Sequence, residues 1–297
     1  MPVMPTARAN GIELEYRVDG DPRGRPLLLV LGLGAQLVWL EDGFVTTLAG
    51  RGFLVASFDN RDVGLSSRLP GAKPDFAAIW SGDLRSLAYT LEDMAADAAG
   101  VLDALGWPAA HVAGISLGGM VAQLLAIHHP GRVLSLASIM STTGDRRVGR
   151  PSAEGATVLT TPMAAQREAH LEQAVANARA LGAGSGYPFE PERIRRAAAR
   201  AFDRSYDPAG VGRQLAAAMG AADRTAALAS VRVPTLVVHG DADRLIDVSG
   251  GEATAAAIPG ARLLKVPGLG HELPPGVWDL LADAIAANAD RAGRHAG

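Results

Sequence analysis

The sequence predicts an α/β fold in which a mostly parallel sheet carries helices on both faces. Apolar runs of strand length alternate with segments of helical period, which is the pattern of a doubly wound parallel sheet. Residues 27–31 (Leu-Leu-Leu-Val-Leu) are apolar at every position, as expected of a strand buried on both faces. Residues 141–229 have helical period and no convincing strand. That segment predicts a helical insertion between two strands of the sheet.

Hydrophobic period and turn residues set the boundaries of the predicted elements. Asn10-Gly11 is the two-residue signal of a type I′ turn, so an antiparallel hairpin should precede the parallel strands. The predicted strands cover residues 6–9, 12–18, 27–31, 53–58, 112–115, 133–140, 233–240 and 262–266. The predicted helices cover residues 42–48, 91–105, 117–129 and 277–285, and a polar tail follows from residue 290.

Composition and charge exclude several classes of function. With 297 residues, 48 % of them hydrophobic, the chain can bury a full core and is globular. The net charge is −3 and no basic run is present, so we expect neither nucleic acid nor a membrane as a partner. Cysteine is absent, which excludes disulfides, thiolate metal sites and a cysteine nucleophile. The first six residues lack the pattern of a signal peptide, so we expect a cytoplasmic protein of open oligomeric state.

A nucleophilic serine is indicated where the strand at residues 112–115 meets the following helix. Residues 114–118 (Gly-Ile-Ser-Leu-Gly) form the pattern G-x-S-x-G in strand–turn–helix context. The turn holds the hydroxyl of Ser116 clear of the sheet edge, and side chains two residues away on either side would collide there. The amide of Leu117, at the helix N-terminus, should face the oxygen on which negative charge develops. The alternative is a glycine-rich turn with an inert serine.

The base that a serine hydroxyl needs is His271 in this interpretation. It stands in residues 266–272, a loop directly after the last predicted strand, and therefore at the catalytic edge of the sheet. The competing histidines lie at a helix end, in the helical insertion, in the tail, or on a strand without a well-placed acid. They are His111, His128, His129, His170, His239 and His295.

The acid that orients the base is expected after a strand that ends at the same edge. Asp243 is preferred because it lies far enough along its loop to face His271. We expect Asp241 to form a turn by bonding its own backbone. Asp241, Asp247 and Asp145 remain as alternatives for the acid.

Four motifs in order carry a resemblance to a known family. They are Asp59-x-Arg61-x-x-Gly64-x-Ser66, Gly114-x-Ser116-x-Gly118-Gly119, Gly240-Asp241-x-Asp243 and Gly268-x-Gly270-His271. With them the whole chain resembles a serine-dependent α/β-hydrolase with a helical cap. The resemblance implies an eight-stranded, mostly parallel sheet, a core of residues 1–140 and 230–297, and a cap (lid) of residues 141–229 inserted after strand 6. Among subfamilies the chain is most similar to the aclacinomycin methylesterase type, which removes a methyl ester from an anthracycline polyketide.

The resemblance also assigns a second donor for the oxyanion, and the chain departs from the family at two places. The implied donor is the backbone amide of Leu33. Most relatives carry His-Gly where this chain has Leu31-Gly32, and Arg-Gly where it has Arg61-Asp62. The first departure leaves the backbone donor intact, and the second makes the polar turn after residue 58 unusual. The fold needs no organic cofactor, and no metal-binding motif is present.

The predicted activity is hydrolysis of a carboxylic ester or lactone of a small to medium apolar substrate through an acyl-enzyme. Relatives that dehalogenate or open epoxides carry an aspartate at the position of Ser116, so neither reaction is expected. Two alternatives stay open: hydrolytic carbon–carbon cleavage of dienoic ring-fission products, and a non-catalytic ligand-binding protein on the same fold.

Substrate choice should depend on apolar residues of the insertion and of the loops opposite it. The residues expected to bind substrate are Trp39, Trp80, Met140, Tyr187, Phe189 and Tyr206, with Met163, Leu171, Phe202, Leu215 and Met219 as further candidates. For most of the insertion residues the alternative, packing of the cap helices onto the sheet, is the right one.

Overall fold

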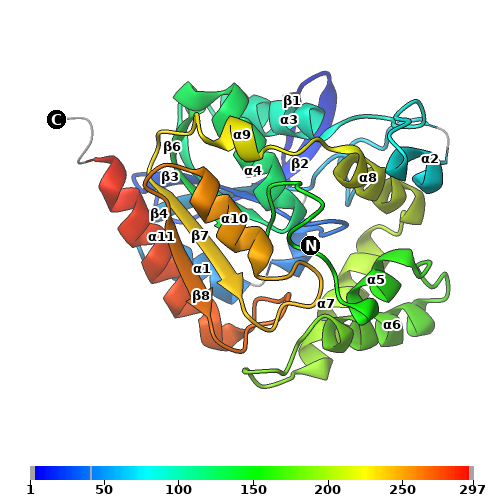
Figure 1. Ribbon diagram of the computed structural model, residues 1–297. Coiled ribbons are helices and arrows are strands. Elements are labelled where there is room, and N and C mark those ends of the chain that lie inside the picture. The colour runs from blue at the N-terminus through cyan, green and yellow to red at the C-terminus, as the bar shows by residue number, and fades with distance from the viewer. Residues whose placement is uncertain (1–3, 41, 72, 294–297) are drawn as a thin grey trace.

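The computed structural model describes residues 4–40, 42–71 and 73–293, which form an eight-stranded sheet with helices on both faces (Figure 1). The strand order is β1-β2-β4-β3-β5-β6-β7-β8. The pairs β1–β2 and β2–β4 are antiparallel, and the neighbours from β4 through β8 are parallel. The predicted fold class is therefore confirmed.

The strands lie where hydrophobic runs predict them. They are β1 (Thr6–Ala9), β2 (Ile12–Asp19), β3 (Arg25–Val30), β4 (Phe53–Phe58), β5 (Ala110–Ile115), β6 (Val133–Ile139), β7 (Thr235–Gly240) and β8 (Arg262–Val266). Asn10 and Gly11 have φ of 46° and 81°, and Ala9 pairs with Ile12, as a type I′ hairpin requires.

Helices pack on both faces of this sheet and also fill the connection between β6 and β7. The helices are α1 (Asp42–Ala49), α2 (Phe76–Trp80), α3 (Leu91–Ala104), α4 (Leu117–His128), α5 (Ala153–Thr160), α6 (Arg167–Ala180), α7 (Pro191–Arg204), α8 (Pro208–Gly220), α9 (Thr225–Leu228), α10 (Ser249–Ala257) and α11 (Trp278–Ala292). Short 3₁₀ turns are η1 (Leu37–Trp39), η2 (Pro130–Arg132) and η3 (Pro275–Val277). The predicted tail begins later than residue 290 because α11 continues through Ala292, and residues 294–297, His295 included, lie outside the described residues.

Two helices were not expected from the sequence. The first, α2, is short and is capped by the Asp75 side chain, which accepts a hydrogen bond from the amide of Ala78 (3.0 Å). The second, α10, buries Gly250, Gly251 and Thr254. A helix that packs through such small residues lacks the stripe of large apolar side chains that makes helical period visible in a sequence.

The apolar core consists of two clusters, one on each side of the sheet. Leu28 and Val30 of β3 pack with α3 and α4, whereas Leu27 and Leu29 pack with α1 and α11. Alternate residues of β3 therefore enter opposite clusters, which explains why the whole run is apolar. Within the described part of the chain, no helix is long and apolar enough to cross a bilayer.

The segment between β6 and β7 holds α5 to α9, and none of its residues, all of which are described, forms a strand. We call residues 141–229 the helical insertion. In Figure 1 its helices α5, α6 and α7 form a group beside the sheet, while α9 lies near α10. The insertion enters at the carboxyl end of β6, the edge where ligands bind in open α/β sheets, and the chain then returns to the amino end of the parallel strand β7.

Candidate active site

Ser116 lies on a sharp turn between β5 and α4, as the G-x-S-x-G pattern predicts. Its φ of 55° and ψ of −118° are a strained conformation for a residue with a side chain. A Cβ on Gly114 would lie 2.1 Å from the carbonyl oxygen of Gly118, and one on Gly118 would lie 2.1 Å from that of Val30. Only glycine fits at these two positions, and the close packing keeps the turn and its serine in place.

Ser116, His271 and Asp243 form one chain of hydrogen bonds. The Ser116 Oγ lies 3.0 Å from Nε2 of His271, and Nδ1 of His271 lies 2.7 Å from Oδ2 of Asp243. Asp243 follows β7 and His271 follows β8, so the carboxyl ends of three parallel strands supply the three residues. The structure thus brings together the serine, histidine and acid that the sequence analysis selected.

The second oxygen of Asp243 is held by backbone amides. Its Oδ1 accepts hydrogen bonds from the amides of Leu245 (2.8 Å) and Ile246 (2.9 Å). Burial acts to raise the pKa of the Asp243 carboxyl, but the neighbouring His271, hydrogen bonds from His239 and His271, and the Ile246 amide outweigh burial and hold that pKa well below its usual range. The carboxyl therefore stays ionised beside His271 at neutral pH.

His239 supports this acid, a role that the sequence analysis missed. Its ring is fully buried, and its Nε2 lies 2.7 Å from the carbonyl oxygen of Ile246 and 3.5 Å from Oδ2 of Asp243. The ring therefore contacts both ends of the Asp243–Ile246 turn. The sequence signal for this role was a histidine at the end of a buried strand, four residues before the acid.

Asp241 does not bond its own turn, so that expectation is wrong. Its Oδ1 accepts a hydrogen bond from the amide of Gly268 (2.6 Å), in the loop that carries His271. Strands β7 and β8 are adjacent and parallel, so the loops that follow them begin side by side at the same edge of the sheet. Neither Asp145 nor Asp247 takes the place of the acid. Asp145 pairs with Arg147 (2.8 Å), and Asp247 accepts a hydrogen bond from the amide of Ser249 (3.0 Å).

The loop after β3 passes alongside the nucleophile. A Cβ on Gly32 would lie 3.3 Å from the carbonyl oxygen of Ile115 and 3.4 Å from Cβ of Ser116. The amide of Ala35 donates to the carbonyl of Gly32 (3.2 Å), which closes a tight turn around Leu33. Gly32 therefore lies against the turn that carries Ser116, Leu33 follows Gly32 in this loop, and Leu117 follows Ser116 at the start of α4.

The helical insertion makes hydrogen bonds to loops on three sides of the site. The amide of His271 donates to the carbonyl of Leu181 (3.0 Å), and the amide of Ser152 donates to the carbonyl of Arg244 (2.9 Å). A third hydrogen bond joins α8 to the loop after β3. The insertion is thus attached to the loops after β3, β7 and β8.

Several residues expected to bind substrate have other neighbours. Trp80 is 59 % exposed, and the guanidinium of Arg146 lies 4.6 Å from its ring centroid, so its ring is largely at the protein surface. The ring of Phe189 packs under the guanidinium of Arg179 (4.1 Å). Met140 is 2 % exposed, because it packs in the apolar cluster below the sheet edge.

The other three of the six residues expected to bind substrate are half-buried. Trp39 lies in η1, and Tyr187 packs against the same apolar cluster as Met140. Tyr206 packs against Phe202 (4.8 Å between ring centroids) and donates a hydrogen bond to the carbonyl of Met163 (3.2 Å). Tyr206 is therefore part of the packing among the insertion helices.

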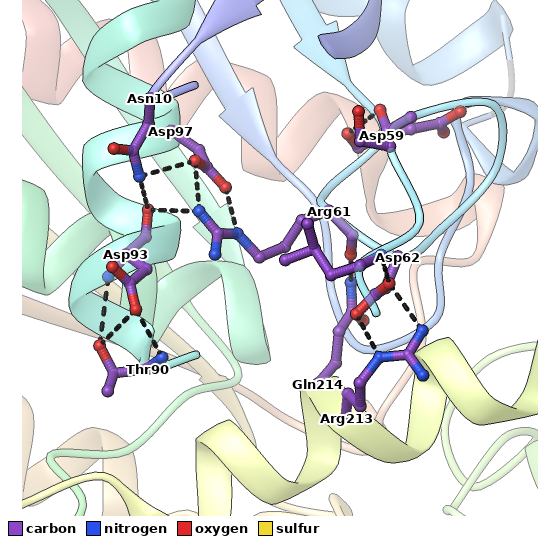
Figure 2. Close-up of polar contacts among 12 residues, drawn as sticks. Asn10, Asp59, Arg61, Asp62, Thr90, Asp93, Asp97, Arg213 and Gln214 are labelled. Carbon is purple, nitrogen blue, oxygen red and sulfur yellow. Dashed lines mark hydrogen bonds and ion pairs between the residues drawn. The ribbon is translucent and has the colours of Figure 1, made fainter. Parts of the chain in front are cut away.

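A second polar cluster occupies the turn after β4, residues 59–62 (Figure 2). Arg61 makes two hydrogen bonds to Asp97 of α3, each 2.6 Å, and Asp62 accepts two from Arg213 of α8, each 2.8 Å. Asp62 has a φ of 68°, which aspartate tolerates better than most residues. An arginine of the insertion thus satisfies both oxygens of the buried Asp62 carboxylate.

Asp59 joins the same turn to α7. Its two oxygens accept hydrogen bonds from the amides of Leu37 (2.7 Å) and Leu65 (3.1 Å), and Arg204 pairs with it at 2.6 Å. Arg204 also pairs with Glu15 of β2. The side chains of these three residues are buried, so one guanidinium of the insertion serves two carboxylates of the sheet, and burial raises the pKa of Asp59 to about 7.

Metal ligands are not clustered in the described part of the chain. No group of three or more histidine, cysteine, aspartate or glutamate side chains among those residues is placed to hold an ion.

The chain belongs to the alpha/beta hydrolase fold family, whose model matches residues 25–274. It is 33 % identical to rhodomycin D methylesterase DauP of Streptomyces sp. (strain C5) over 91 % of this chain and 92 % of that protein. It is 32 % identical to rhodomycin D methylesterase DnrP of Streptomyces peucetius over 96 % and 98 %. The crystal structure of the enol-lactonase from Burkholderia xenovorans LB400 is similar with a TM-score of 0.67, at 25 % identity over 97 % and 99 %. The family resemblance of the motifs is confirmed.

Proposed function

We propose that the protein hydrolyses a carboxylic ester, with Ser116 as nucleophile, His271 as base and Asp243 as the acid that orients the base. The observation that carries this proposal is the unbroken chain of hydrogen bonds from Ser116 Oγ through the His271 ring to Asp243, on a strained turn. Ester hydrolysis is favoured over other uses of such a triad because DauP and DnrP, similar over nearly the whole chain, are methylesterases.

The reaction follows from the proton positions that this geometry allows. Ser116 Oγ attacks the ester carbonyl while Nε2 of His271 takes the hydroxyl proton, and ionised Asp243 stabilises the resulting imidazolium. The amides of Leu33 and Leu117 donate to the oxygen that becomes negative. His271 then gives its proton to the leaving alcohol. Water, deprotonated by His271, attacks the acyl group on Ser116, and His271 returns the proton to Ser116 Oγ as the bond to the acyl group breaks and the carboxylic acid leaves.

The substrate class is a small to medium apolar ester, and a methyl ester is the first choice. The methylesterase relatives support the methyl ester, and the similarity to an enol-lactonase extends the proposal to lactones. We propose that the core is residues 1–140 and 230–297, and that the helical insertion is a cap over Ser116 that sets substrate choice. Its hydrogen bonds to the loops after β3, β7 and β8 support that role.

A substrate panel tests this proposal. Methyl esters of aromatic acids, short aryl esters, lactones and a dienoic ring-fission dione should be assayed by product formation, with Ser116→Ala as the blank. We expect kcat/KM to be highest for an ester or lactone and to vanish in the blank. Preferred turnover of the dione would replace ester hydrolysis by carbon–carbon cleavage. Binding of a panel member without turnover would favour a ligand-binding protein.

A further inference from the structure

Gln214 of α8 bridges two loops at the catalytic edge of the sheet. Its side chain is fully buried, its Oε1 accepts a hydrogen bond from the amide of Gly34 (2.9 Å), and its Nε2 donates one to the carbonyl of Arg61 (2.7 Å). Gly34 belongs to the loop after β3, and Arg61 to the turn after β4 (Figure 2). One side chain of the helical insertion therefore joins the main chains of two neighbouring core loops.

The loop that Gln214 holds carries the proposed oxyanion donor. Gly34 directly follows Leu33 and has a φ of 65°, so its conformation is one that only glycine adopts easily. A Cβ on Gly34 would lie 3.1 Å from Cγ2 of Val211, one turn before Gln214 on α8. The orientation of the Leu33 peptide is thus fixed from one side by β3 and from the other by α8.

Helix α8 is itself anchored to the core beside this loop. Arg213 makes its paired hydrogen bonds to Asp62, and a Cβ on Gly210 would lie 2.2 Å from the carbonyl oxygen of Asp62. A shift of α8 would break a buried ion pair. Gln36, two residues beyond Gly34, also donates to the carbonyls of Ala201 (2.9 Å) and Ser205 (2.8 Å), so the end of α7 holds the same loop.

We propose that Gln214 is a positioning residue for the oxyanion hole, which makes the helical insertion part of the support of the reaction centre. This inference rests on the proposed function, because the Leu33 amide affects the rate only if a tetrahedral oxyanion forms beside it. An oxyanion hole stabilises the transition state more than the bound ester. Loss of the Gln214 bridge should therefore lower kcat and leave KM nearly unchanged, whereas a residue that contacts substrate would change KM.

The test compares Gln214→Met with a matched glutamine of the insertion. Methionine has a similar volume but cannot bridge the Gly34 amide and the Arg61 carbonyl. We expect kcat for an aryl ester to fall roughly 10- to 100-fold, since a displaced oxyanion donor costs less than a deleted one. Gln173→Met is the control: Gln173 of α6 also accepts from an amide, that of Ala164 (2.8 Å), and donates to a carbonyl, that of Pro162 (2.9 Å). Both partners lie within the insertion, so kcat should be unchanged.

The same measurements separate this inference from the proposed function. A folded Gln214→Met variant with native kcat, whatever its KM, would overturn the positioning role. The proposed function would still hold if Ser116→Ala is inactive. Activity retained by Ser116→Ala would overturn both. If Gln214→Met does not fold, Gln214→Asn keeps the amide but is one methylene shorter. In that variant a fall in kcat at constant KM supports the role, and an unchanged kcat overturns it.

Discussion

Two polar clusters lie at the same edge of the sheet and differ in the partner given to each carboxylate. In the turn after β4, Asp62 faces Arg213, whose charge is permanent. At the candidate active site, Asp243 faces His271, whose imidazole ring has one nitrogen toward the carboxylate and the other toward the hydroxyl of Ser116. The turn therefore fixes the insertion to the core, and the proposed triad moves a proton. The two carboxylates are equally buried, so the kind of partner, a guanidinium or an imidazole that also contacts a serine, distinguishes a site that stabilises from a site that reacts.

The largest expected effect is a loss of activity at the candidate active site without a loss of stability. Ser116→Ala should lower ester hydrolysis roughly 10⁴-fold or more, because the residual rate comes only from the oxyanion donors and substrate binding. The free energy of unfolding should change little, since one hydroxyl at a turn is removed. Steady-state kinetics and urea unfolding of the same preparation measure both quantities. Near-native turnover by the variant would show that another group attacks the ester.

A comparable loss of rate is expected when the acid is changed. Asp243→Asn should lower kcat up to ~10⁴-fold, because an asparagine amide at that place favours the wrong tautomer of His271. Asp241→Asn is the matched control from the same loop, since Asp241 bonds the Gly268 amide and does not bond His271. Asp241→Asn should lower kcat far less than Asp243→Asn does. The reverse order of the two variants would make Asp241 the orienting acid.

In the turn after β4 a substitution should lower the stability of the fold. Arg213→Met leaves the fully buried Asp62 carboxylate without its cation, so we expect a loss of about 3–5 kcal/mol in the free energy of unfolding. Arg147→Met is the control, because Arg147 pairs with Asp145 at the surface and its side chain is 84 % exposed. That exposed pair is worth about 0–1 kcal/mol. Equal losses in the two variants would mean that the buried pair does not anchor α8.

The smallest expected effect concerns the buried histidine of β5. Burial, followed by the nearby Arg25, lowers the pKa of His111 from 6.5 to about 4. Between those pH values the unfolded chain binds a proton at His111 that the folded chain does not bind, so stability falls as pH falls through this window. From pH 7 to pH 5 we expect His111 to contribute about 2 kcal/mol of that loss.

Urea unfolding at the two pH values measures this contribution. His111→Gln, which keeps a polar partner near Ser135, should lose this part of the pH dependence. The same pH dependence in both proteins would assign the acid sensitivity to other groups.

The fold and the three central site residues were predictable because local patterns specify them. The buried parallel strands contain short apolar runs, such as residues 27–30 of β3, and the glycines around Ser116 are required by contacts as short as 2.1 Å. His271 and Asp243 could be selected because they follow parallel strands that end at the same edge of the sheet as β5, the strand before Ser116.

Long-range pairings of the insertion could not be predicted. Arg204, Arg213 and Gln214 contact residues more than 140 positions earlier in the chain, and nothing in their local sequence distinguishes them from exposed residues of the same helices. The hydrogen bond from the Gly268 amide to Asp241 was missed for a related reason, because it depends on how the loops after β7 and β8 are placed relative to each other. Trp80 was expected to bind substrate because it is an apolar residue in the connection opposite the insertion, and the sequence did not predict that its ring packs under Arg146 at the surface.

The most direct test of the central claim is to locate the covalent adduct that a fluorophosphonate ester forms with the protein. Peptide mass spectrometry should find one phosphonyl group, on Ser116, and hydrolytic activity should disappear in proportion to its formation. Labelling should be absent in Ser116→Ala and much slower in Asp243→Asn. A phosphonyl group on another residue, or full ester turnover after Ser116 is modified, would contradict the assignment of Ser116 as the nucleophile.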